Sequence, residues 1–355
     1  MKSGRIVSKS LLNITNLLHA DYKLVSPVCQ PLHRQKESND SLISERSIQL
    51  KKAIISGVTG FFGSALARLL LREGTEVIGI GTNEERMKEL EKLPGFRPVY
   101  ADFSLYTELP ALIPDRGADV FYHFAWAGGF TTAIRDYHLQ MKNAACAGDA
   151  LTAAYRMNAG RFVYAGTYNQ FEISRFLDTQ GFEPRYTCIY SAGKTAGGLI
   201  CRTLAYNLGI PYVGGLAAMP YGEGNRSMQL VNVVITSLLK GEAPRLVEGN
   251  NPYDLVYIDD IARAFQALGE KGRNGHEYYI GHRTIPTFRQ WMIRIRDILS
   301  PDTPLLFGAY EDRQQIDFNH IDLEALYRDT GFACRADFDE TIRRTADWVK
   351  LHLMS

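Results

Sequence analysis

The segment that decides the fold reads Ile54-Ile55-Ser56-Gly57-Val58-Thr59-Gly60-Phe61-Phe62-Gly63-Ser64-Ala65-Leu66. Its start continues an apolar run from Ala53, which predicts a buried strand, and apolar residues then recur at helical spacing as far as Gly74, the expected C-cap. Glycine at every third position lets the strand turn sharply into the helix, lets backbone approach a ligand and lets helix pack on strand. The N–H groups at the start of that helix can hold a pyrophosphate.

Composition indicates an ordinary globular protein. The 355 residues are 45% hydrophobic and 22% charged, with a net charge of +1. Such a balance gives no basic surface for nucleic acid, and no apolar run reaches membrane-spanning length. The five cysteines are scattered and form no C-x-x-C pair, so we expect reduced, buried thiols and a cytoplasmic protein. The eight histidines show no zinc spacing, and we expect no metal.

Alternating strands and helices predict a doubly wound α/β fold with a parallel sheet covered on both faces. We predict strands at 52–56, 76–80, 98–100, 119–124, 161–166 and 211–217, and helices at 62–73, 83–92, 135–157 and 190–208. Beyond Gly214 the alternation loosens. There we predict helices at 227–240, 259–269, 286–299, 322–329 and 338–352, and strands at 255–258 and 277–280.

Three parts follow from this pattern. Residues 1–48 form an N-terminal extension or linker, with one short amphipathic helix between Leu11 and Leu18 and no convincing targeting signal. Residues 49–217 form a Rossmann dinucleotide-binding domain. Residues 218–355 form a smaller α/β lobe for the substrate, with parts of 253–281 returning to the Rossmann sheet.

A candidate catalytic pair lies on the helix after the fifth strand. Tyr190 and Lys194 are four residues apart and therefore share one helix face. A nearby ammonium stabilises tyrosinate, so we expect the pKa of Tyr190 to fall and the tyrosine to act as an acid/base. Thr167 lies at the end of the fifth strand, in a segment from Ala165 to Glu172 that resembles the Ser/Thr segment of a known family, and the resemblance implies that its hydroxyl orients the reacting oxygen. The alternative is that Thr167 only caps the next helix.

With its G-x-x-G-x-x-G turn and Y-x-x-x-K pair, the chain from about residue 51 to 350 resembles the extended short-chain dehydrogenases/reductases, the NAD(P)-dependent epimerase/dehydratase family. The resemblance implies that Asp102 and Phe103 hold the adenine, that the end of the fourth strand follows the cofactor, and that Asn143 braces the site. His123, within that strand, is expected to be packed rather than to bind a ligand. The implied cofactor contacts are Gly57, Thr59, Gly60, Phe61, Phe62, Gly63, Thr82, Asn83, Arg86, Asp102, Phe103, Phe124, Ala125, Trp126, Asn143, Tyr190 and Lys194.

The end of the second strand bears on the choice of cofactor. NAD sites place a carboxylate there to hold the ribose hydroxyls, but this chain has Gly81, followed by Thr82, Asn83 and Arg86. Hydroxyl, amide and guanidinium groups suit a 2′-phosphate, so we expect NADP(H) in preference to NAD(H). Alternatively, Arg86 pairs with Glu85 or Glu89 on its own helix.

At the substrate end the chain departs from the family pattern. Tyr253 stands where the family often has a diphosphate-binding arginine, and Met219 stands where it has an asparagine; Arg226, Arg245 or Arg283 could replace the arginine. The expected substrate contacts are Trp126, Thr167, Tyr168, Asn169, Met219 and Tyr253.

The sequence predicts an oxidoreductase that acts on a sugar or nucleotide sugar as a homodimer. The resemblance is nearest to the 4-ketoreductases of deoxysugar pathways. Tyr168-Asn169 replaces the acidic pair of dehydratases, which argues against dehydration. An NAD-dependent sugar-nucleotide 4-epimerase is the alternative enzyme, and a non-catalytic NADP-binding sensor or scaffold is the alternative outside enzymes.

Overall fold

The computed structural model describes residues 50–129, 132–173, 183–313 and 316–354. The predicted extension of residues 1–48 and its short helix lie outside the described residues. From Ser47 onward the chain forms one compact unit.

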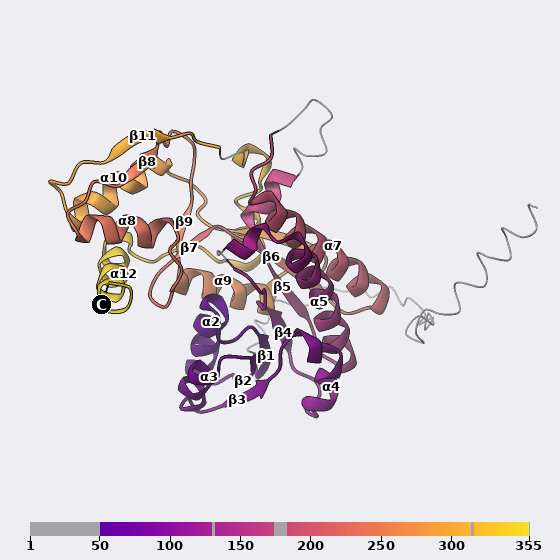
Figure 1. The fold of residues 1–355 in the computed structure, drawn as a ribbon. Coiled ribbons are helices and arrows are strands. Elements are labelled where there is room, and N and C mark those ends of the chain that lie inside the picture. Colours follow the sequence, from indigo (N-terminus) through magenta and orange to yellow (C-terminus); the bar gives the residue numbers. More distant parts are fainter. Residues whose placement is uncertain (1–49, 130–131, 174–182, 314–315, 355) are drawn as a thin grey trace, which may run out of the picture. The chain divides into compact units, whose positions relative to one another are not determined.

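Seven parallel strands form the central sheet, in the order β10-β6-β5-β4-β1-β2-β3 (Figure 1). Strand β1 lies in the middle, between β2 and β4, with Ile54 opposite both Ile78 and Phe121. The predicted doubly wound parallel sheet is confirmed. The bounds are β1 Lys52–Ser56, β2 Glu76–Gly81, β3 Phe96–Tyr100, β4 Val120–His123, β5 Phe162–Thr167, β6 Tyr212–Ala217 and β10 His276–Ile280.

Helices cover both faces of this sheet, because its strands are apolar on both sides. Helices α2 (Phe61–Arg72) and α9 (Ile258–Lys271) pack on one face, with α3 (Glu84–Glu91) beside β3. Helices α5 (Tyr137–Arg156) and α7 (Cys188–Leu208) pack against each other on the other face, near α4 (Leu109–Leu112) (Figure 1).

A second cluster of elements has its own apolar core (Figure 1). It contains α8 Leu230–Leu239, α10 Phe288–Leu299, α12 Phe338–His352 and two small parallel sheets, β7 Met219–Tyr221 with β9 Leu255–Tyr257, and β8 Arg245–Val247 with β11 Leu306–Tyr310. Helix α11 Ala325–Thr330 packs beside β10 instead. The short strands β7, β8 and β11 were not predicted, since three to five residues carry too little alternation.

Short 3-10 helices complete the described fold: η2 Phe103–Glu108, η3 Thr132–Arg135, η4 Tyr168–Glu172 and η5 Phe318–His320. Within the described part of the chain, no helix is both long and apolar enough to cross a membrane. Four cysteines there are free thiols, three of them buried.

Candidate active site

The turn between β1 and α2 depends on two of its glycines. Gly57 has φ +71°, and a Cβ there would lie 2.6 Å from the backbone nitrogen of Ala125. A side chain at Gly63 would collide with the carbonyl oxygen of Gly57. Gly60 closes the turn by donating its N–H to that same carbonyl, at 2.9 Å. The chain can therefore pass this close to the end of β4 only with glycine at positions 57 and 63.

A cleft of ≈ 350 Å³ opens beyond this turn, along the carboxyl ends of β1, β2 and β4. Most of its lining is the predicted cofactor set: Gly57, Thr59, Gly60, Thr82, Asp102, Phe103, Phe124, Ala125 and Trp126. The sequence did not single out the remaining lining residues, Ile80, Gly81, Ala101, Tyr106 and Ala127. Asp102 places an ionised carboxylate, a hydrogen-bond acceptor, at the β3 end of this cleft.

At the end of β2 the cleft has a glycine, Gly81, where a side chain would fit only tightly. A Cβ at Gly81 would lie only 3.1 Å from the methyl carbon of Thr59. The alternative prediction that Arg86 pairs with Glu85 or Glu89 is wrong, because its guanidinium instead donates to the carbonyl oxygen of Thr59 at 2.9 Å. Asn83 caps α3 by accepting from the Arg86 N–H at 3.0 Å.

Asp102 and Phe103 lie where β3 leads into η2. The carboxylate of Asp102 accepts from the N–H and hydroxyl of Ser104, at 2.8 and 2.6 Å. These hydrogen bonds lower the pKa of Asp102, so that it stays ionised. Phe103 packs edge-on against Tyr106 beside the same cleft.

Asn143 holds the wall of the cleft after β4. Its side-chain oxygen accepts from the Ala127 N–H at 3.0 Å, and its amide donates to the Ala127 carbonyl at 2.9 Å. Gln140, one turn earlier on α5, accepts from the Trp126 indole N–H at 2.8 Å. Gln140 was not singled out in the sequence, although it shares a helix face with Asn143. Both residues position the wall without lining the cleft.

The three candidate catalytic residues converge at the end of β5. Tyr190 and Lys194 are buried on α7, 8% and 5% exposed, and the Tyr190 and Thr167 side chains hydrogen-bond each other. The Lys194 ammonium donates to the Ala165 carbonyl at 2.8 Å and lies 3.9 Å from the centroid of the Trp126 ring. Thr167 also caps η4, accepting from the Asn169 N–H at 3.4 Å, so its two readings are compatible.

The expected fall in the pKa of Tyr190 was wrong for this structure. Burial raises the pKa of Tyr190, and the hydrogen bond with Thr167 opposes this only in part. Burial also lowers the pKa of Lys194 to about 7, so that near neutral pH this side chain carries only part of its charge. Desolvation is the largest cause of both shifts.

His123 is a packed strand residue, as predicted. It is 1% exposed, its Nδ1 lies 2.8 Å from the Ser56 hydroxyl, and its ring stacks on Phe162 and Tyr164. Burial lowers its pKa to about 3, which keeps the ring neutral.

A second pocket, of ≈ 400 Å³, lies toward the smaller lobe. Tyr253 lines it, and its hydroxyl hydrogen-bonds the buried Tyr168 next to Thr167. Of the three arginines proposed from sequence, Arg245 lines this pocket, while Arg226 lines a different one and Arg283 pairs with Glu324. Arg185 and Arg313, which the sequence did not single out, join Arg245 there.

Arg185 is held by an ion pair to the buried carboxylate of Glu172. In the sequence, Arg185 is recognisable only as a charged residue just before α7. Its pocket also contains the aromatic rings of Tyr253, Phe288 and Tyr310, and the Arg245 guanidinium lies 5.2 Å from the Tyr310 centroid.

The remaining predicted residues lie outside both the cleft and this pocket. Phe62 packs in the core against Phe124 and Phe265, and Phe61 lines a third pocket with Arg86. Asn169 is buried at the start of η4, and Met219 begins β7.

Asp260 does not cap α9, whose N-cap residue is Tyr257 without a side-chain cap. Its carboxylate instead accepts from the N–H groups of Arg335 and Ala336 and pairs with Arg263. This contact joins α9 to the segment before α12, a long-range contact that local spacing cannot reveal.

The chain is similar in sequence to known proteins of one family. The sequence model of the NAD dependent epimerase/dehydratase family matches residues 53–281. A dTDP-glucose 4,6-dehydratase from Mycobacterium tuberculosis is 24% identical, over 84% of this chain and 93% of its own. A probable dTDP-glucose 4,6-dehydratase from Sinorhizobium fredii is 26% identical, over 84% and 92%.

Solved structures agree on the fold. The UDP-glucuronic acid 4-epimerase from Bacillus cereus, in complex with NAD, has a TM-score of 0.68 at 21% identity, covering 84% of this chain and 99% of its own. A double mutant of DesIV, a dTDP-glucose 4,6-dehydratase from Streptomyces venezuelae with NAD and DAU bound, has a TM-score of 0.69 at 23% identity, covering 84% and 97%. The chain therefore belongs to the NAD-dependent epimerase/dehydratase family of extended short-chain dehydrogenases/reductases.

Proposed function

We propose that this protein is an NAD(P)-dependent oxidoreductase that reduces a 4-keto group on a nucleotide sugar. The observation that carries the proposal is the convergence of Thr167, Tyr190 and Lys194 at the end of β5, beside Trp126, which lines the cleft. A protein that only bound the cofactor would have no need of a hydrogen-bonded Thr167–Tyr190 pair with Lys194 one turn further along the same helix.

The chain's own groups have distinct tasks in this reaction. A bound nicotinamide would supply the hydride to the sugar carbon. Tyr190 donates the proton to the sugar oxygen, and Thr167, which hydrogen-bonds Tyr190, holds that oxygen in place. In its protonated form Lys194 supplies positive charge beside the site, and Trp126, whose ring the ammonium contacts, lines the cleft.

The surroundings of Thr167 support reduction rather than dehydration. Removal of water from a sugar needs an acid and a base beside the catalytic hydroxyl. Tyr168 is hydrogen-bonded to Tyr253, and the nearest carboxylate along the chain, Glu172, is buried and paired with Arg185. Because several similar proteins are dTDP-glucose 4,6-dehydratases, dehydration is an alternative reaction to be tested.

A 4-epimerase is the second candidate, because the similar UDP-glucuronic acid 4-epimerase is titled as a complex with NAD. The same three residues serve both reactions, so product analysis decides between them. Net consumption of added NADPH with a keto-sugar supports a reductase. Interconversion of two sugars without net consumption of cofactor supports an epimerase.

We also propose that the substrate carries a nucleoside diphosphate, in the pocket of Arg185, Arg245 and Arg313. Arginine donates pairs of hydrogen bonds to phosphate, and the rings of Tyr253 and Tyr310 can stack on a base. Arg245→Ala should raise KM for a nucleotide sugar more than it changes kcat. An unchanged KM would contradict this placement.

The preference for NADP(H) rests on Gly81 and Arg86. Gly81 carries no carboxylate that would repel a 2′-phosphate, and the Arg86 guanidinium donates to the Thr59 carbonyl at the same end of the cleft. Titrations with NADPH and NADH should show tighter binding of NADPH, and Arg86→Ala should remove that difference. Equal affinities in the unaltered protein would refute the preference.

Finally, we propose a homodimer through α5 and α7. Their outer faces expose Tyr137, Met141, Tyr155, Leu199, Ile200 and Tyr206. Light scattering should give the mass of two chains, and Leu199→Glu should shift it toward one. A monomer in the unaltered protein would refute the proposal.

A further inference from the structure

Lys194 is buried with little ordinary compensation for its charge. Its side chain is 5% exposed, and burial lowers its pKa to about 7. The ammonium donates to the Ala165 carbonyl at 2.8 Å, and among the described residues no carboxylate forms an ion pair with it. A desolvated cation with so few polar partners is costly, so the groups packed around it decide how readily it keeps its proton.

Two aromatic rings face this ammonium. The Lys194 Nζ lies over the Trp126 ring, 3.9 Å from its centroid, and 5.5 Å from the centroid of the Tyr164 ring. The electron-rich face of an aromatic ring attracts a cation, most strongly for tryptophan and most strongly where water is excluded. Both rings therefore favour the protonated form of Lys194, and the nearer Trp126 ring favours it more.

A buried glutamine holds Trp126 over α7. The indole N–H can only donate, and it donates to Oε1 of Gln140 at 2.8 Å. The Gln140 amide in turn donates to the Ala133 carbonyl at 3.1 Å, and this side chain is fully buried. The Trp126 ring also meets the Tyr190 ring edge-on, at 6.3 Å between centroids. Both ends of the Gln140 amide are in use, so the indole is fixed beside the catalytic residues.

The titratable side chains of the elements packed around Lys194 are mostly neutral near pH 7. Burial raises the pKa of each phenol and of the thiol among them, and it lowers the pKa of the imidazole to about 3. A carboxylate on β10 accepts from the Tyr212 hydroxyl at 3.0 Å and acts on the thiol rather than on the ammonium. These groups are Tyr190 and Cys201 on α7, Tyr164 on β5, His123 on β4 and Glu277 on β10. The charge of Lys194 therefore depends on the Ala165 carbonyl and on the two rings.

We propose that Trp126 is a positioning residue whose ring keeps Lys194 in place and protonated, and that Gln140 keeps the ring there. This inference rests on the proposed function for the task of Lys194, which is to supply positive charge beside Tyr190. It adds one residue after β4 and one on α5 to the set that controls proton transfer. Neither the indole nor the amide reacts, because each acts through the ammonium.

The pH dependence of stability tests this proposal. Above the lowered pKa of a buried lysine, the free energy of unfolding rises with pH, because the unfolded chain binds the proton and the folded chain does not. In the unaltered protein this rise begins near pH 7. In Trp126→Leu it should begin about one pH unit lower, and in Trp126→Phe, which keeps a ring, the shift should be smaller. Urea denaturation at a series of pH values from about 5.5 to 9 measures where the rise begins.

Two controls separate this effect from a loss of packing. Phe121→Leu removes a buried ring from β4 that stacks on Phe162 rather than on Lys194, so it should lower stability at every pH and leave the onset of the rise unchanged. In a Lys194→Met background, Trp126→Leu should no longer alter the pH dependence. An onset in Trp126→Leu equal to that of the unaltered protein, or an equal shift in Phe121→Leu, would overturn the proposal.

Gln140→Leu tests the second link without removing the ring. It leaves the indole N–H without its acceptor, so the onset should move in the same direction as in Trp126→Leu. An unchanged onset in Gln140→Leu would refute the role of Gln140.

Turnover of a 4-keto nucleotide sugar gives an independent readout. If the pKa of Lys194 falls by one unit, its charged fraction and kcat should fall about fivefold at pH 7 but only about twofold at pH 6. A shifted onset in Trp126→Leu, with no turnover even in the unaltered protein, would support this inference and contradict the proposed function. Turnover in the unaltered protein with an unshifted onset in Trp126→Leu would do the reverse.

Discussion

Asn143 offers a direct test of how the wall of the cleft is held. In Asn143→Ala both side-chain hydrogen bonds to Ala127 disappear, at 3.0 and 2.9 Å in the native protein. Each such bond contributes about 0.5–1.5 kcal/mol net, so the free energy of unfolding should fall by about 1–3 kcal/mol. Ala127 is half-buried, so water can replace part of the loss, and the lower half of that range is expected.

The same variant should weaken cofactor binding, because Ala127 lines the cleft and loses its support. Urea denaturation measures the stability, and a fluorescence titration with NADPH measures the affinity. Asn274→Ala is the control, since Asn274 accepts one hydrogen bond from the Tyr212 N–H at the amino end of β6. It should lose stability without losing affinity. Equal loss of affinity in both variants, or an unchanged Asn143→Ala, would refute the bracing role.

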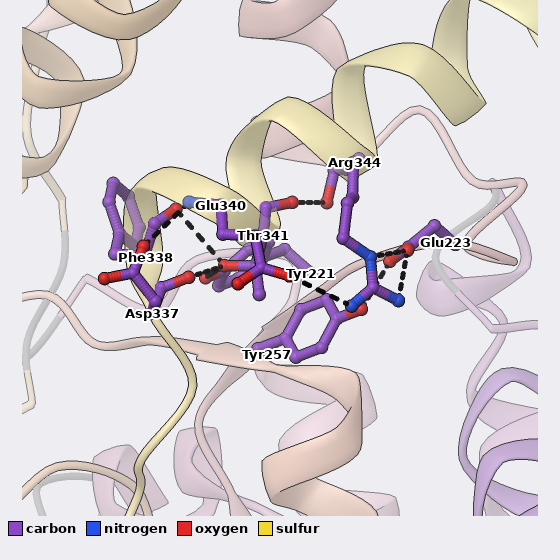
Figure 2. Close-up of polar contacts among 9 residues, drawn as sticks. Tyr221, Glu223, Tyr257, Asp337, Phe338, Glu340, Thr341 and Arg344 are labelled. Atoms are coloured by element: carbon purple, nitrogen blue, oxygen red, sulfur yellow. Dashed lines mark hydrogen bonds and ion pairs between the residues drawn. The ribbon is translucent and has the colours of Figure 1, made fainter.

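Three further predictions test the site and the fold. In urea denaturation, Gly57→Ala should destabilise the protein by more than the strain of a left-handed backbone, which is about 1–2 kcal/mol, because the new Cβ also collides with the Ala125 backbone. Gly74→Ala is the control: Gly74 has φ +85° and open space around it, so this variant should show only the strain. Between pH 7 and 10 Lys194 is protonated in the unfolded chain but not in the folded chain, so the free energy of unfolding rises by about 1.4 kcal/mol per pH unit from this group. Lys194→Met should remove that slope. Parallel curves of stability against pH for the unaltered protein and the variant would contradict the lowered pKa. Tyr221→Phe and Thr341→Val should each cost about 1 kcal/mol, and a double-mutant cycle should show coupling, because the two hydroxyls lie 2.7 Å apart in the core between β7 and α12 (Figure 2).

The main elements could be predicted because their signals are local. A glycine turn between an apolar strand and an amphipathic helix, repeated strand–helix alternation and the Tyr190/Lys194 spacing each lie within a few turns of chain. The predicted strand 52–56 coincides with β1, and the predicted helix 338–352 coincides with α12. The short strands β7, β8 and β11 were not predicted because three to five residues are too few to show an alternating pattern.

Parts of the site could not be predicted because they depend on partners distant in sequence. Arg86 was expected to contact a cofactor or a helix neighbour, yet it hydrogen-bonds Thr59, 27 residues away. Arg185 and Arg313 reach one pocket from segments more than a hundred residues apart along the chain. Spacing along a helix or strand carries no information on such meetings.

By itself, the sequence determined the doubly wound sheet and the glycine turn, since these follow from short-range periodicity and glycine geometry, while the family followed from the resemblance of its motifs. Only the tertiary structure decided the protonation of the site and the surroundings of its arginines. Burial raises the pKa of Tyr190 and lowers that of Lys194, against the effect that their spacing predicts. Desolvation and long-range pairing depend on everything packed around a group, and that environment exists only once the chain has folded.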